Sequence, residues 1–208
     1  MYNFTSFYIM IEITISKDDF KKSEIPWLEL GLKTLAIHGL SNIKIDVMSK
    51  KLNISRTSFY HLFTSKNNYI YRLCEFWAYS GTFKYIERLQ RIEKPSEKLI
   101  EIIRFISRDR LEGIAWISYK HIGDNNHEVK NILHKIESLR IEFVSGILIG
   151  LGYSDEQAKV KARVLMYFLF GWLVLEWPKE KKNEISESEI IELLRSIEID
   201  LNFHDSQS

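Results

Sequence analysis

From Trp27 onward, apolar residues recur every three or four positions, which is the period of a helix with one buried face and not the alternation of a strand. This pattern predicts an all-α fold of about nine helices. The first covers Trp27–Gly39, two short ones lie within Ile43–Lys66, and the others span residues 67–93, 96–108, 110–121, 128–151, 154–177 and 186–200.

Residues that start or stop helices support these boundaries. Pro95 separates two of the long helices, and the run from Gly123 to Asn126 is typical of a loop. Ser154 and Ser186 each precede a Gln or Glu three positions later, a spacing that indicates a capping box at the first turn of a helix.

The segment Ile43–Lys66 predicts a helix-turn-helix. Its two apolar stripes have helical spacing and consist of Ile45, Met48 and Leu52, then Phe59, Leu62 and Phe63. Between them, Asn53 tolerates a positive φ, Ile54 can fill the corner, and Ser55 is a good N-cap for the second helix.

The sequence Ser-Arg-Thr-Ser-Phe-Tyr-His-Leu-Phe-Thr-Ser-Lys at Ser55–Lys66 resembles the recognition helix and following turn of the TetR (tetracycline-repressor) family of bacterial regulators. Trp27–Gly39 resembles that family's first helix, including its terminal His38-Gly39 pair, and no gap is needed from Gly39 to Lys66. There are two departures: Asn53 replaces the usual turn glycine, and the common capping threonine is missing near Ile43. Ser41 or Asn42 could cap that helix instead if it starts early.

The resemblance covers about the first third of the chain and implies a DNA-binding transcriptional regulator. It implies an N-terminal arm at residues 1–23, a helix-turn-helix domain at 24–66 and a helical ligand-binding and dimerisation domain at 67–208. From the resemblance we expect a cytoplasmic homodimer that represses from a palindromic double-stranded DNA operator until a small-molecule inducer binds. A DNA-binding adaptor that responds to a protein partner remains the alternative.

The N-terminal end of the second helix in a helix-turn-helix enters the major groove, which selects the residues expected to contact DNA. Arg56 can donate two hydrogen bonds to a guanine, whereas Lys66 and Lys44 are placed to meet phosphates. The full set of expected DNA contacts is Lys44, Ser55, Arg56, Thr57, Ser58, Tyr60, His61 and Lys66.

Charge is distributed unevenly between the expected DNA-binding segment and the rest of the chain. Trp27–Arg72 contains seven Lys or Arg and two acidic residues, a net charge of +5, whereas the whole chain is only +1. The remainder is therefore net acidic, at −4. A basic module attached to a mildly acidic body is typical of a protein that places one end on DNA.

Val164–Leu175 contains only apolar residues and glycine, which favours a helix that meets its own core on one side and a partner on the other. A wholly internal core helix is the alternative. The segment is too short to cross a bilayer, which takes roughly 20 such residues. We expect this helix and the last one to form a four-helix bundle with their copies across a two-fold axis. The expected interface residues are Met166, Phe170, Gly171, Val174, Ile190 and Leu194.

Aromatic residues on the intervening helices are candidates for a ligand cavity. Aromatic side chains at helical spacing are more often core, but several together with hydroxyl and indole groups also suit an apolar cavity with a few polar groups. The candidate lining residues are Phe76, Trp77, Phe83, Phe105, Trp116, Tyr119 and Phe143.

An enzyme is disfavoured by the sequence. It lacks a Gly-rich phosphate loop after a strand, a Cys cluster and a His-Glu-x-x-His pair, so we expect no catalytic residues, no metal site and no cofactor. The single cysteine, Cys74, excludes an intramolecular disulfide and fits a reducing cytosol. Met1–Ser16 lacks the basic start and cleavage site of a signal peptide, and Met10 is a second candidate start.

Overall fold

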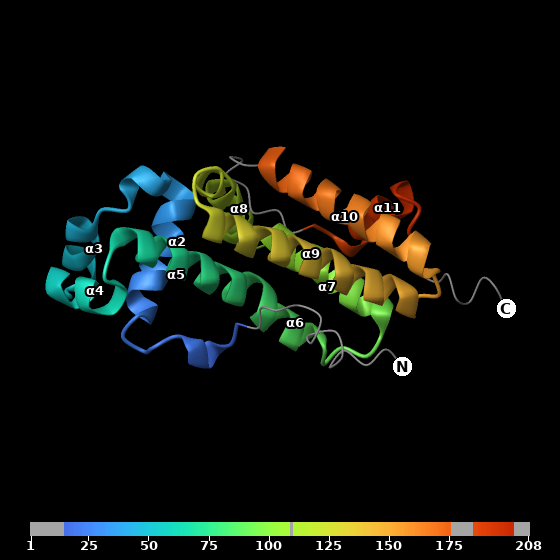
Figure 1. The fold of residues 1–208 in the computed structure, drawn as a ribbon. Helices are drawn as coiled ribbons and strands as arrows, with labels where there is room; N and C mark the ends of the chain where they lie inside the picture. Colours follow the sequence, from blue (N-terminus) through green and yellow to red (C-terminus); the bar gives the residue numbers. More distant parts are fainter. Residues whose placement is uncertain (1–14, 109, 176–184, 202–208) are drawn as a thin grey trace. The chain divides into compact units, whose positions relative to one another are not determined.

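The computed structural model describes residues 15–108, 110–175 and 185–201, without the side chains of residues 110, 112, 173 and 174. Within these ranges the chain is helical with no strand, which confirms the all-α class (Figure 1). The described residues divide into two compact units. The N-terminal unit runs up to Tyr85 and adds Ile114–Ile136, and the C-terminal unit contains Ile86–Gly113 and the chain from Glu137 onward.

The N-terminal unit is built on four helices: α2 (Ile25–His38), α3 (Ile45–Leu52), α4 (Arg56–Phe63) and α5 (Lys66–Ala78). Short 3-10 turns, η1 (Lys17–Asp19) and η2 (Leu40–Asn42), precede and follow α2. Helix α2 packs against α3 and α5, and α4 packs against the same two helices, so α3 and α4 lie side by side (Figure 1). Parts of α8 (Arg110–Gly123) and α9 (His127–Gly150) complete the unit.

An aromatic cluster centred on Phe59 forms the core of these helices. Phe59 is fully buried, and its ring centroid lies 5.0–5.3 Å from those of four other aromatic residues, Trp27, Tyr60, Phe63 and Tyr69. Most of these pairs have the edge-to-face geometry that aromatic quadrupoles favour. The cluster joins α2, α4 and α5 and thereby fixes the rotation of α4 about its own axis.

A close contact between α2 and α5 depends on Gly31. The buried Tyr69 hydroxyl donates a hydrogen bond of 2.6 Å to the carbonyl of Trp27, one turn before Gly31. A Cβ added at Gly31 would lie 1.8 Å from that hydroxyl oxygen. Glycine at this position therefore allows the tyrosine to reach the α2 backbone. Burial raises the pKa of Tyr69, so its phenol stays protonated.

The long helix expected over residues 67–93 is present but is neither regular nor as long. It consists of α5, a π-helical turn at Tyr79–Phe83 and α6 (Lys84–Leu89), where the helix ends. The π-helical turn carries an i→i−5 bond from the Lys84 N–H to the Tyr79 carbonyl and contains the buried residues Gly81 and Thr82. Apolar spacing does not reveal a single wide turn, because the flanking α-helical segments keep their period.

In the C-terminal unit, α7 (Pro95–Arg108) packs against both α10 (Asp155–Leu175) and α11 (Glu187–Ser196). Both predicted capping boxes are confirmed. The hydroxyl of Ser154 accepts the N–H of Gln157 at 3.2 Å, and Ser186 does the same for Glu189 at 3.3 Å. The side chain three positions later returns the bond to the serine N–H in each case.

Helix α10 has a buried face and an apolar exposed face, which corrects part of the expected dimer interface. Met166 of α10 and both Ile190 and Leu194 of α11 are buried within the protomer, so they pack into its own core. Phe170 is half-buried under Arg140, Gly171 is exposed, and the Val174 side chain lies outside the described residues. The exposed apolar side chains of α10 are instead Val160, Val164, Tyr167, Phe168 and Leu175.

Replacing Gly31 by alanine is expected to destabilise the N-terminal unit. The new Cβ must displace Tyr69, and overpacking of this kind costs about 1–3 kcal/mol, which exceeds the gain from alanine's higher helix propensity. Chemical denaturation measures the loss. In a Tyr69→Phe background the same change should cost less, because the clashing hydroxyl is gone. An equal cost in both backgrounds would contradict the proposed origin of the strain.

Candidate nucleic-acid interface

The helix-turn-helix expected from the sequence has the expected turn. Asn53 adopts the left-handed conformation with φ 54°, which places the Ile54 N–H within 3.0 Å of the Ser49 carbonyl. The Ser55 hydroxyl then accepts the N–H of Ser58 at 3.1 Å and caps α4. Asparagine serves here because its short polar side chain makes a positive φ less costly than it is for other non-glycine residues.

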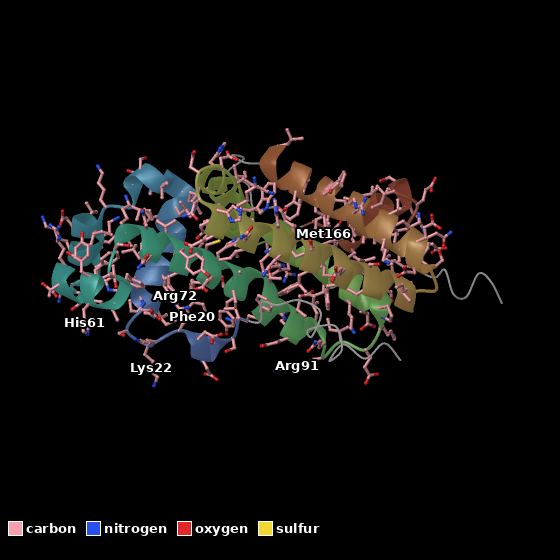
Figure 2. All side chains as sticks on the ribbon, in the orientation of Figure 1. Phe20, Lys22, His61, Arg72, Arg91 and Met166 are labelled. Atoms are coloured by element: carbon pink, nitrogen blue, oxygen red, sulfur yellow. The ribbon has the colours of Figure 1, made fainter. Side chains whose placement is uncertain are left out.

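The outer face of α4 presents the polar residues singled out in the sequence. Arg56, Thr57, Tyr60 and His61 are exposed, whereas Phe59 and Phe63 on the opposite face are buried. Figure 2 shows His61 at the periphery of the ribbon, extending away from it. Since Phe59 is locked in its aromatic cluster, this polar face cannot turn inward without breaking that cluster.

Ser55 and Ser58 are less available for DNA than their neighbours. The Ser55 hydroxyl already accepts a backbone N–H as the N-cap of α4. The hydroxyl oxygens of Ser55 and Ser58 lie 3.0 Å apart, and the Ser58 residue is half-buried. Both hydroxyls keep some hydrogen-bonding capacity, because each can donate once and accept twice. Their first role in the structure is to start α4.

Arg56 already has partners on the protein surface. Its guanidinium lies 2.9 Å from the Asp46 carboxylate of α3 and 5.8 Å from the centre of the Tyr60 ring. A hydrogen bond with Tyr60, together with the charge of Asp46, raises the pKa of Arg56, which stays charged. The pairing of Arg56 with Asp46 could not be predicted from the sequence, because it depends on the angle between α3 and α4. The contact holds Arg56 at the exposed first turn of α4.

Lys66 and Lys44 both lie at helix starts and are exposed. Ser65 caps α5 by accepting the N–H of Asn68 at 3.1 Å, and Lys66 is the first residue of that helix. Lys44 precedes α3 without any side-chain cap. The Asn42 amide instead donates to the His38 carbonyl at 2.6 Å, so it does not cap α3.

One of the seven cations counted in the basic segment is used internally. Arg72 lies 3.2 Å from the buried Glu24 and 2.9 Å from Glu75, and its guanidinium stacks 4.4 Å from the centre of Phe20 (Figure 2). Arg72 also donates to the Asp19 carbonyl. This group attaches the segment before α2 to α5. The exposed positive charge of the domain therefore comes mainly from lysines.

The aromatic residues expected to line a ligand cavity are distributed over both units. Phe76, Trp77, Phe83 and Tyr119 are buried in the N-terminal unit, and the rings of Trp77 and Tyr119 lie 5.3 Å apart. Trp116 is half-buried, with the Lys120 ammonium 5.2 Å from its ring. Phe105 and Phe143 belong to the C-terminal unit.

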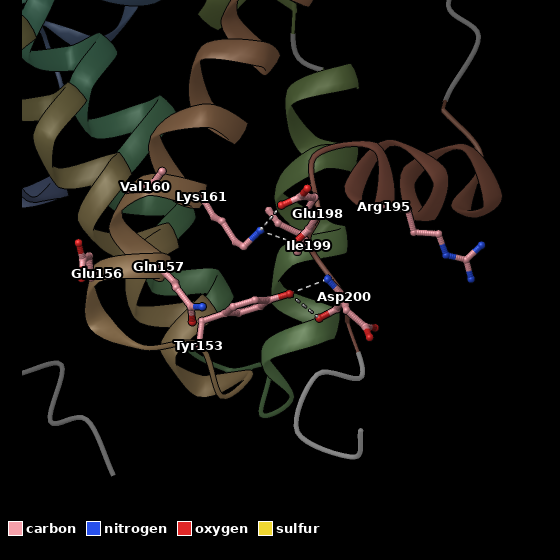
Figure 3. A pocket seen from close by; sticks show the side chains of 9 residues that line it. All are labelled: Tyr153, Glu156, Gln157, Val160, Lys161, Arg195, Glu198, Ile199 and Asp200. Carbon is pink, nitrogen blue, oxygen red and sulfur yellow. Dashed lines mark hydrogen bonds and ion pairs between the residues drawn. The ribbon is translucent and has the colours of Figure 1, made fainter. Parts of the chain in front are cut away.

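Other residues line a cavity of about 830 Å³ in the C-terminal unit. It is bounded by the start of α10 and the chain after α11 (Figure 3). In this cavity the Tyr153 hydroxyl accepts a hydrogen bond from the Asp200 N–H at 2.7 Å, and the Lys161 ammonium donates one to the Glu198 carbonyl at 2.5 Å. Among the described residues no cluster of His, Cys, Asp and Glu is arranged to hold a metal ion. None of their helices combines the length and apolarity needed to span a membrane.

Comparison with solved structures shows which fold these elements form. A TetR transcriptional regulator from Legionella pneumophila superposes with a TM-score of 0.67 at 14% identity, over 86% of this chain and 97% of that one. A transcriptional regulator from Rhodococcus sp. Rha1 gives 0.65 at 17% identity, over 85% and 97%. AibR, solved in complex with isovaleryl coenzyme A and operator DNA, gives 0.60 at 13% identity, over 84% and 96%. No family model and no curated protein matches the sequence.

The chain therefore has the fold of TetR-family transcriptional regulators over most of its length, an N-terminal helix-turn-helix followed by a larger helical region. The segment Ser55–Lys66, which resembles that family's recognition helix and following turn, covers α4, the turn after it and the start of α5. The segment that carries the sequence resemblance therefore coincides with the second helix of the observed helix-turn-helix.

Replacing Arg56 by alanine should reduce discrimination between the operator and random DNA by about 1–3 kcal/mol, as expected when a bidentate contact to guanine is lost. Fluorescence anisotropy with both duplexes measures the difference. Thr34→Ala on α2, a half-buried position outside α4, serves as a control that should leave discrimination unchanged. An equal loss on both duplexes would make Arg56 a phosphate contact.

Replacing Lys66 by alanine should weaken binding to every DNA sequence. The slope of log affinity against log salt should become shallower by about one unit, as expected for one lost phosphate contact. Titrations at several salt concentrations with one duplex measure this slope. Lys84→Ala, an exposed lysine on α6, is the matched control. An unchanged slope for the Lys66 variant would rule out the phosphate contact.

Proposed function

We propose that this protein is a DNA-binding transcriptional regulator that uses α4 as its recognition helix. The observation that carries the proposal is the division of α4 into two faces: the Phe59 face is locked in the core, and the face with Arg56, Thr57, Tyr60 and His61 is exposed. That arrangement matches what a recognition helix requires, because base-edge contacts need outward polar side chains on a rigidly held helix. The shared TetR fold supports the same role.

Within this proposal the side chains divide between bases and phosphates. Arg56 at the first turn of α4 contacts a guanine, and Thr57 contacts a neighbouring base edge or thymine methyl. Lys66 and Lys44, exposed at helix starts, contact phosphates and fix the orientation of the domain without selecting sequence. The Asp46 carboxylate lies 2.9 Å from the Arg56 guanidinium. This ion pair must weaken when the Arg56 side chain turns towards a base.

The protein acts as a homodimer in this proposal, with the exposed apolar face of α10 at the two-fold axis. Val160, Val164, Tyr167 and Leu175 of that face are 45–79% exposed in the protomer. They lie with Gly171 on one side of α10, since their spacing follows the helical period. Apart from its chain neighbours and the backbone of α10 itself, no described residue has an atom within 4 Å of a Cβ built on Gly171, so a partner helix could approach closely there. Isologous contacts of this kind give the two-fold symmetry that a palindromic operator requires.

The last part of the proposal concerns regulation. The protein is a repressor, and binding of a small molecule releases it from its operator. AibR, which shares the fold, is described with both isovaleryl coenzyme A and operator DNA bound. The two ligands then share one coupling free energy, so an inducer that lowers operator affinity tenfold must bind tenfold more weakly to the DNA complex, a difference of about 1.4 kcal/mol.

Selection of bound fragments from the source genome, followed by footprinting, tests the DNA-binding function. The expected result is a palindromic sequence whose two protected half-sites are centred about 34–36 Å apart, one turn of DNA, or a multiple of it. Repeating the selection with the Arg56→Ala variant should lose the consensus while keeping weak general binding. Failure of the wild-type protein to enrich any sequence would contradict the proposal.

Replacing Val164 by glutamate tests the dimer. The residue is 45% exposed in the protomer, so the fold should survive, but an unpaired charge buried at the two-fold axis should weaken dimerisation by about 3 kcal/mol or more. Sedimentation equilibrium and circular dichroism measure assembly and folding separately. Lys159→Gln makes the same change in net charge at an exposed position of α10 and should leave the dimer intact. A normal dimer of the Val164 variant would exclude this face.

A further inference from the structure

A second cavity, of about 610 Å³, lies within the N-terminal unit close to the proposed phosphate contact. Its walls are the chain just after α2, the first turn of α5 and the last turn of α8 with the loop that follows. The volume falls within the range of about 300–1,000 Å³ that small-molecule sites occupy. A bond of 3.4 Å from the Ser118 hydroxyl to the Leu35 carbonyl joins α8 to α2 beside it. We call this cavity the α5–α8 groove.

The chemistry of the α5–α8 groove favours an anion. The polar side chains that line it are one cation, one imidazole, three amides and one hydroxyl: Lys66, His121, Asn67, Asn125, Asn126 and Ser118. No lining residue is a carboxylate; Asp124, the acidic residue in the adjoining loop, is exposed and outside the lining. The remaining side chains, Leu40, Ile70 and Ile122, are apolar.

Several of these polar side chains have no hydrogen-bond or ion-pair partner within the described part of the chain. The side chains of Lys66, Asn67, His121 and Asn125 make no hydrogen bond or ion pair there, in contrast to Asn126, whose amide oxygen accepts the Val129 N–H at 3.1 Å. The larger cavity in Figure 3 differs in this respect, because Lys161 is already paired with Glu198. Donors without a partner on the protein can bind a ligand without first breaking a contact.

We propose that the α5–α8 groove binds a small organic carboxylate. A single ammonium surrounded by neutral donors matches a monoanion, whereas a phosphate dianion would call for a second cation. In this proposal Lys66 and His121 bind the carboxylate, and Leu40, Ile70 and Ile122 contact a short hydrocarbon chain. The ligand is thus anionic at one end and apolar at the other.

Binding in the α5–α8 groove opposes DNA binding directly, and this consequence rests on the proposed phosphate contact of Lys66. One ammonium cannot neutralise a DNA phosphate and a ligand carboxylate at the same time. The ligand therefore removes one phosphate contact and adds a negative charge near the DNA. The resulting antagonism requires no movement of a helix, unlike an effect transmitted from a distant cavity.

Hexanoate and its uncharged analogue hexanamide are the probes that test the site without DNA. In protein labelled at histidine ring carbons, the His121 signal, assigned with the His121→Ala variant, should shift and saturate at millimolar hexanoate. Hexanamide should bind at least about tenfold more weakly, because it lacks the charge-assisted bonds to Lys66. The His121→Ala variant, followed by a general thermal-stability titration, should also bind hexanoate more weakly.

His134→Ala is the matched control, since His134 is an exposed histidine of the same unit that does not line the groove. It should bind hexanoate as the wild type does. Absence of a saturable shift at His121, equal binding of hexanamide, or equal losses in the two histidine variants would overturn the proposed site.

A DNA titration tests the antagonism separately. Hexanoate replaces chloride at constant total sodium, and binding to a short duplex should weaken about fivefold or more in the wild type but not in Lys66→Ala. Saturable hexanoate binding with unchanged DNA affinity would overturn the competition for Lys66. Failure to bind any duplex would count against the proposed function alone, because the histidine titration needs no DNA.

Discussion

The rotation of α4 about its axis depends on the burial of Phe59. Four aromatic rings surround this side chain at 5.0–5.3 Å, and they come from α2, α4 itself and α5. Turning α4 to hide its polar face would expose Phe59 and remove these contacts, each of them worth about 0.5–1.5 kcal/mol beyond area burial. The Tyr69 bond to the Trp27 carbonyl, made possible by Gly31, holds α5 against α2 and so closes the cluster. A hydrophobic constraint thus determines which side chains are available for DNA.

Electrostatics acts within that constraint and divides the cations by role. Arg72 is held between Glu24 and Glu75 and serves the packing of the N-terminal segment on α5. Arg56 is exposed but pairs with Asp46, so its geometry is restricted before it meets DNA. Lys66 stands at a capped helix start and faces a groove with no lining carboxylate. A net charge summed over the segment does not distinguish these three situations, although it gives the correct sign for a DNA-binding surface.

Local rules were sufficient wherever one short segment determined the outcome. Asn53 at the turn, Ser55 at the start of α4, and the capping boxes at Ser154 and Ser186 all appear as the sequence predicts, because each depends on contacts within four residues. The same rules left the cap of α3 open, and the structure shows no side-chain cap there. They failed at Tyr79–Phe83, where a π-helical turn interrupts the predicted helix. That turn leaves the apolar period of the flanking segments intact, so the pattern cannot reveal it.

The sequence by itself determined the all-α class, the helix-turn-helix and the outward polar face of α4, since periodicity and capping specify which side of a helix is apolar. Only the tertiary structure decided which apolar residues face the protomer's own core. Met166, Ile190 and Leu194 are buried there, whereas Val160, Val164 and Tyr167 are exposed. A helix that is apolar on every side has no hydrophobic period that distinguishes core from surface. The helices that pack against it therefore determine which of its side chains are buried. The pairing of Asp46 with Arg56 and the assembly of the α5–α8 groove likewise depend on helices brought together by folding.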